Sequence, residues 1–173
     1  MPSVIKKSDS GVRRLTFIAL LGAVSGALQI AEGFFPGIIP LPGGRLGLAN
    51  ILSLAALQLF GAPSAFGVAV LKSLLALMFG GNVSAFLYSL AGGLFSVLMM
   101  WTGTRLKGIS SVGLGVIGAF SNNLAQTAVG AILLTNPYIL SYLWILGPVS
   151  VVTGVFTGVC TRFLLNKLKG WSS

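Results

Sequence analysis

Three charged side chains stand apart from the other charges of the sequence. Glu32 and Lys72 each fall within a long apolar run, and Arg45 follows two glycines in LPGGRLGLAN. A lysine near the centre of a bilayer costs roughly 2.5–3.5 kcal/mol, so it normally faces the interior of a helix bundle and finds a partner there. Two cations beside one anion leave a surplus of positive charge, which suits a carboxylate or a phosphate. The sequence therefore predicts an anion site at Arg45 and Lys72, with Glu32 close by.

Each of these charges also has a structural interpretation. Lys72 and Glu32 could form an ion pair inside the bundle, and Arg45 could contact lipid headgroups of the outer leaflet. The sequence leaves both interpretations open.

Uncharged polar residues add candidates to the same site. Asn122 and Gln126 are four residues apart, so they share one face of a helix. Amides inside a membrane need hydrogen-bonding partners, which either a neighbouring helix or a ligand can supply. Asn50 and Asn82 are weaker candidates for ligand contacts.

Catalytic residues, metal ligands and cofactors are not expected. The sequence contains no histidine, and its only acidic residues, Asp9 and Glu32, are far apart. This excludes His-based acid–base catalysis and His-ligated metal sites.

The elements that must position the candidate residues are membrane-spanning helices. The chain of 173 residues is 55% hydrophobic and 8% charged, with a mean hydropathy of +0.97, whereas a soluble domain carries roughly 25% charged residues. Apolar runs of about 20 residues recur, without the alternating polar positions of barrel strands. We therefore expect an all-α membrane protein, and we assign the net charge of +9 to topology and lipid headgroups rather than to nucleic acid.

Six helices are predicted in one membrane domain, residues 15–166, between a basic N-terminal segment, 1–14, and a basic tail, 167–173. The turn residues place these helices at about 15–35, 46–60, 65–79, 84–102, 112–134 and 139–165. Six spans put both termini on one side, which then receives all basic residues except Arg45 and Lys72: Lys6, Lys7, Arg13, Arg14, Arg105, Lys107, Arg162, Lys167 and Lys169. The positive-inside rule makes that side the cytoplasm.

Small residues form a stripe on the first predicted helix, at Ala19, Gly22, Ala23, Gly26 and Ala27. At about 100° per residue, Glu32 points away from this stripe. Such a smooth face allows another helix to approach closely, either from a partner protein or from the same chain.

The blocks GRLGLANI and LKSLLALMFGGNVSAFLYSLAGG, together with Ala19, Ala23 and Ala27, resemble the Gx transporter family, also called heptaprenyl diphosphate synthase component I. The resemblance covers about residues 12–166. It places the chain with the substrate-binding S components of energy-coupling-factor (ECF) vitamin transporters.

The resemblance implies a six-helix bundle of the S-component type in the bacterial plasma membrane, with both termini cytoplasmic. Such a protein binds a small molecule from outside and docks to an energy-coupling transmembrane protein with two ATPase subunits. The three alanines would face the coupling protein. The ligand pocket would lie toward the outer side, under the loop that holds Arg45.

The synthase name does not fit the composition. Prenyl diphosphate synthases hold magnesium with clustered aspartates, and two distant acids cannot form such a cluster, so we expect no enzyme. The sequence also has no Walker A pattern, which leaves ATP hydrolysis to partner subunits. We predict an S component that captures a small anionic, partly apolar compound, such as an isoprenoid phosphate or a quinone precursor; a vitamin is less favoured. The alternative is a non-catalytic membrane subunit that anchors or regulates a polyprenyl diphosphate synthase.

Overall fold

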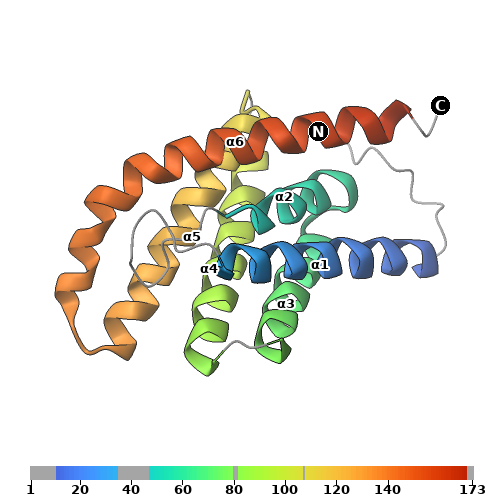
Figure 1. Ribbon diagram of the computed structural model, residues 1–173. Coiled ribbons are helices and arrows are strands. Elements are labelled where there is room, and N and C mark those ends of the chain that lie inside the picture. The colour runs from blue at the N-terminus through green and yellow to red at the C-terminus, as the bar shows by residue number, and fades with distance from the viewer. Residues whose placement is uncertain (1–10, 35–46, 80–81, 107, 171–173) are drawn as a thin grey trace.

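The computed structural model describes residues 11–34, 47–79, 82–106 and 108–170, and these residues form six α-helices and one short 3-10 helix (Figure 1). In chain order the elements are α1 (Gly11–Phe34), α2 (Ala49–Phe60), α3 (Ala62–Met78), α4 (Val83–Thr104), α5 (Ser111–Leu133), η1 (Pro137–Tyr142) and α6 (Leu143–Gly170). The prediction of six helices is confirmed. Of the residues discussed above, Lys6, Lys7, Asp9, Arg45 and Lys107 lie outside the described part of the chain.

The helices differ in whether they are long enough to cross a membrane. Within the described residues, four segments are long and apolar enough: Arg14–Glu32, Val83–Thr104, Ser111–Leu133 and Pro137–Lys167. The second helix is shorter than predicted, because α2 begins at Ala49 and has only 12 residues. At about 1.5 Å per residue it is about 18 Å long, well below the roughly 30 Å of a hydrocarbon core. The chain is a multi-pass membrane protein in which α2 is a short inner helix.

A single residue joins α2 to α3. Gly61 adopts φ 87° and ψ 179°, a conformation that favours glycine, and its amide donates to the Leu57 carbonyl at 3.0 Å. Pro63 then lies in the first turn of α3, where a missing amide proton costs nothing. The predicted break at 61–64, between the second and third helices, is therefore reduced to Gly61, because Ala62, Pro63 and Ser64 already belong to α3.

The core lies where this hairpin meets α4 and α5. Its buried side chains are Leu54, Ala56 and Leu57 of α2, Ala65, Val68 and Ala69 of α3, Val97 and Met100 of α4, and Leu114 of α5. Nine of the 12 residues of α2 are buried, so this short helix is enclosed by its neighbours. The enclosure explains why α2 can be largely apolar although it is too short to span the membrane.

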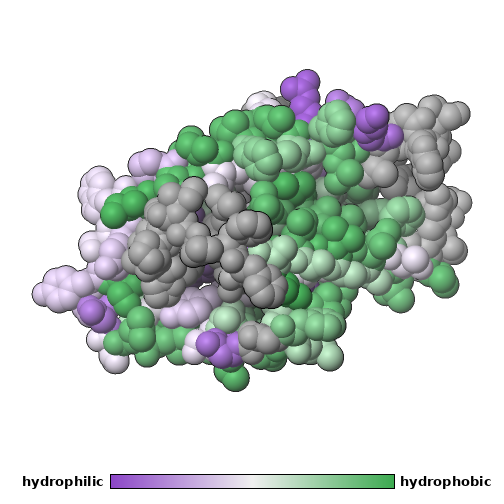
Figure 2. All heavy atoms as spheres, in the orientation of Figure 1, coloured by the Kyte–Doolittle hydropathy of each residue, from purple (hydrophilic) through white to green (hydrophobic). Residues whose placement is uncertain are grey.

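The exterior of the bundle carries the apolar surface expected of a protein in lipid. Large hydrophobic side chains such as Val152 and Phe163 of α6 are exposed, and hydrophobic residues cover much of the coloured surface in Figure 2. Trp144 is 87% exposed beside η1, and the Arg105 guanidinium lies 4.2 Å from the centre of the Trp101 ring at the end of α4. Exposed aromatic residues near helix ends are typical of the membrane–water interfaces.

Side-chain hydrogen bonds fasten one end of the bundle. Arg14 near the start of α1 donates to the Phe60 carbonyl at the end of α2 (3.2 Å) and to Ser64 Oγ at the start of α3 (2.8 Å). Ser111 at the start of α5 donates to Gln58 Oε1 at 3.1 Å. The start of α1 and the end of α6 lie toward the same end of the molecule (Figure 1), as an even number of crossings requires. That this end faces the cytoplasm stays a prediction.

Candidate functional site

Lys72 of α3 is 3% exposed, and its ammonium donates to Asn50 Oδ1 of α2 at 2.8 Å. The hairpin explains this meeting, because Asn50 lies eleven residues before Gly61 and Lys72 eleven residues after it. Two antiparallel helices bring such positions to the same level, about 16 Å from the turn. Lys72 therefore lies deep in the bundle, as the cost of exposing it to lipid predicts.

Glu32 of α1 contacts the start of α2. Its carboxylate accepts a hydrogen bond from the Leu48 amide, the last residue before that helix. The side chain of Leu48 cannot cap α2, and the first amides of a helix carry a positive partial charge. Glu32 thus stabilises the beginning of α2, while Lys72 is bonded to Asn50 two residues further along the chain.

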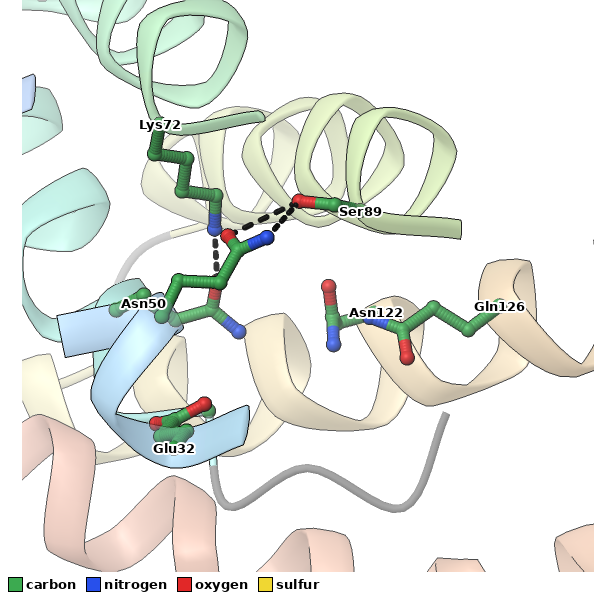
Figure 3. Close-up of a pocket in the computed structure, with 9 residues that line it drawn as sticks. Glu32, Asn50, Lys72, Ser89, Asn122 and Gln126 are labelled. Atoms are coloured by element: carbon green, nitrogen blue, oxygen red, sulfur yellow. Dashed lines mark hydrogen bonds between the residues drawn. The ribbon is translucent and has the colours of Figure 1, made fainter. Parts of the chain in front are cut away.

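These residues surround a small cavity of about 20 Å³, which is space for about one water molecule (Figure 3). It is lined by Gln29, Glu32, Gly47, Ala49, Asn50, Lys72, Ser89, Asn122 and Gln126. Five of the seven predicted binding residues are among them. Asn82 is not: it is exposed, and its Oδ1 accepts from the Ala85 amide at 2.7 Å as the N-cap of α4.

Sequence reasoning missed Gln29 and Ser89. Gln29 Nε2 donates to Ser89 Oγ at 2.7 Å, and Ser89 Oγ lies 2.9 Å from Ser73 Oγ, so one buried network joins α1, α4 and α3. Gln29 lies three residues before Glu32, a spacing that places both on one helix face and could have identified it. Ser89 carries no such signal, since a serine in an apolar helix usually bonds its own backbone.

Two adjacent glycines of α4 allow the lysine and the amides to approach the same cavity. A Cβ at Gly92 would lie 2.6 Å from Asn122 Oδ1 and 2.8 Å from Gln126 Cγ. A Cβ at Gly93 would lie 3.3 Å from Lys72 Cε. The absence of both Cβ atoms lets α3 and α5 pack close against α4 at this level, so their polar side chains line one space.

The small-residue stripe of α1 divides into two parts. Gly22 and Gly26 are buried against α3, where a Cβ at Gly26 would lie 2.9 Å from Leu75 Cδ1. Ala19, Ala23 and Ala27 are exposed. Packing within the chain therefore accounts for the glycines, and docking of a partner at the three alanines stays a prediction.

Comparison with known proteins identifies the family. The model of heptaprenyl diphosphate synthase component I matches residues 21–164, which is most of the chain. The chain belongs to this family. The solved structure of "the S component of a bacterial ECF transporter" matches with a TM-score of 0.73 over 95% of this chain and 99% of that chain, at 20% sequence identity. The chain has no significant match among curated proteins.

The structural likeness confirms the predicted S-component type of helix bundle. The family name refers to a synthase, whose magnesium would need clustered acidic ligands. Within the described residues no three His, Cys, Asp or Glu side chains gather as a metal site would require, and the whole sequence has only two acidic residues. Among the described residues, the cavity is lined by one cation, one carboxylate and several amides.

Proposed function

We propose that this chain is the substrate-binding S component of an ECF importer and that it captures a small anionic, partly apolar compound from outside. The observation that carries the proposal is the burial of Lys72 at a polar cavity deep within an apolar bundle. A charge in this position is costly, and a purely structural bundle would be more stable with an apolar residue there. The cavity has room for about one water molecule, so it must widen for an anion, which then gains a charge-assisted hydrogen bond away from bulk water.

The position of the cavity supports capture from outside. It lies where α1 ends and α2 begins, at the opposite end of these helices from Arg14 and Phe60. Arg14, Arg105 and Lys167 mark the basic end of the bundle, which the positive-inside rule assigns to the cytoplasm. The cavity is then nearer to the outer surface.

Isoprenoid phosphates and quinone precursors are the favoured compounds, because both join a polar head to an apolar body. The family's name supports a connection with isoprenoid metabolism. A vitamin is less favoured.

Energy must come from other subunits, since the sequence has no nucleotide-binding loop. The partners proposed are an energy-coupling transmembrane protein and two ATPase subunits, docked at the exposed alanine face of α1. The bacterial plasma membrane is the proposed location, with both termini in the cytoplasm.

Copurification and transport together test this function. Mild detergent extraction from the bacterial membrane should recover the chain with a membrane protein and two ATPases. ATP-independent concentrative uptake by the chain alone in liposomes would contradict the proposal. Recovery with a soluble polyprenyl diphosphate synthase, and without ATPases, would instead support the anchoring role that the family name suggests.

A further inference from the structure

Gln126 presents an unpaired acceptor at the cavity. Its side chain is 5% exposed and lines the cavity, and its Oε1 atom is buried with no hydrogen-bond donor among the described residues. A buried acceptor without a donor destabilises the protein, because the bond it made to water in the unfolded chain is lost. Such an atom beside a cavity marks a place for a donor that enters the cavity, from a water molecule or from a ligand.

Among the described residues, no donor lies within hydrogen-bonding distance of this oxygen, although the Lys72 ammonium and the Asn122 amide line the same cavity. Gly92 of α4 faces the Gln126 amide, and the backbone amides of α4 are used within the helix. Ser89 has one proton, and both Ser73 Oγ and Gln29 Oε1 lie within 3.0 Å of its oxygen. A donor on a water molecule or ligand group that enters the cavity would pair with this oxygen.

The cavity thus has two different walls. The Lys72 ammonium reaches in from α3, and the amides of Asn122 and Gln126 reach toward the same space from α5 (Figure 3). Lys72 attracts an acceptor that carries negative charge, whereas Gln126 Oε1 needs a donor. A molecule that satisfies both walls must carry both kinds of group.

We propose that the compound bound here is an anion that also carries a hydrogen-bond donor, a hydroxyl or an N–H group, which pairs with Gln126 Oε1. This inference rests on the proposed function and narrows it. A fully ionised phosphate on a plain isoprenoid chain offers only acceptors and leaves Gln126 unpaired. A hydroxylated or amino-substituted acid, such as a phenolic quinone precursor, satisfies both walls. Sites built to pair a ligand hydroxyl strongly reject analogues that lack it.

The probe for the test is a small-molecule extract of bacterial cells, incubated with the purified full chain in detergent. Retained compounds are identified by mass spectrometry, and those lost in Lys72→Met define the cation-dependent set. We expect every member to carry an ionised group and a hydroxyl or N–H donor. Gln126→Met should lower their retention at least tenfold, the loss expected when one buried hydrogen bond is removed. Leu124→Met, on the outward face of α5, is the matched control and should retain them fully.

Melting temperature separates binding from a structural role. Gln126→Met should melt no lower than the wild-type protein, because it removes an acceptor that had no partner. A cation-dependent set without donors, or one retained equally by Gln126→Met, overturns this inference and leaves the proposed function standing. If Gln126→Met fails to fold, the inference is still tested by whether the compounds of the cation-dependent set carry a hydroxyl or N–H donor. If no compound depends on Lys72, the proposed function itself is wrong.

Discussion

At the scale of single residues, substitution of Lys72 distinguishes the two interpretations of its charge. Its bond to Asn50 shows that an uncharged partner already stabilises it, and Glu32 bonds the Leu48 amide. If Lys72 receives an anion, Lys72→Met should weaken binding of the compounds retained from cell extract by about 10- to 100-fold, or about 1.5–3 kcal/mol. The variant should still insert and fold, because methionine removes a costly charge. Equilibrium binding and melting temperature check both expectations.

The structural interpretation of Lys72 makes the opposite prediction. Removal of the lysine would leave Glu32 without a counter-charge and lower the melting temperature, and adding Glu32→Gln would restore it. Unchanged binding together with such a rescue would remove Lys72 from the site.

Gly92 tests the site without changing a polar atom. Its Cβ would lie 2.6 Å from Asn122 Oδ1, so Gly92→Ala should displace the amides and weaken binding at least tenfold. Overpacking of this kind costs about 1–3 kcal/mol, which a lower melting temperature would report. Gly103→Ala on the same helix is the control, because its Cβ would meet the ends of the Leu114 and Ile117 side chains, which do not line the cavity. Equal effects of the two variants on binding would contradict a special role for Gly92.

At the scale of helices, larger side chains on the two faces of α1 should have different effects on partner docking and on stability. Ala23 is exposed, so Ala23→Leu should abolish copurification of the ATPases while binding by the isolated chain is retained. Gly26 is packed against Leu75, so Gly26→Leu should lower the melting temperature of the isolated chain. If Ala23→Leu also unfolds the chain or loses binding, the exposed alanines have a structural role.

At the scale of the whole molecule, the predicted orientation can be read from labelling. In a Cys160→Ser background, Ser141→Cys lies in η1 and Thr104→Cys at the opposite end of α4, and both positions are exposed. A membrane-impermeant maleimide should label Ser141→Cys in intact cells, and Thr104→Cys only after permeabilisation. The reverse pattern would place the cavity nearer the cytoplasm and contradict capture from outside.

The sequence predicts the bundle well because its determinants are local. Apolar runs bounded by Gly61, Asn82 and Pro137 mark the helices. Lys72 is predicted as a site residue because a charge within an apolar run is costly in the membrane. The sequence does not predict that α2 is short, because Leu46 and Leu48 continue the apolar run on the N-terminal side of Ala49, the first residue of the helix. Ser89 was missed for another reason: its role depends on which residue of α1 packs opposite it, and that is fixed only by the tertiary structure.

The one-residue turn at Gly61 also bears on how the chain enters the membrane. A helix of 12 residues is too short to be inserted as an independent span, so we expect α2 and α3 to enter together as a helical hairpin. Within that hairpin, Asn50 and Lys72 face each other before α4, α5 and α6 have arrived. Asn50 can therefore bond the Lys72 ammonium within the hairpin, so the ammonium has a hydrogen-bonding partner while the chain is being inserted into the membrane.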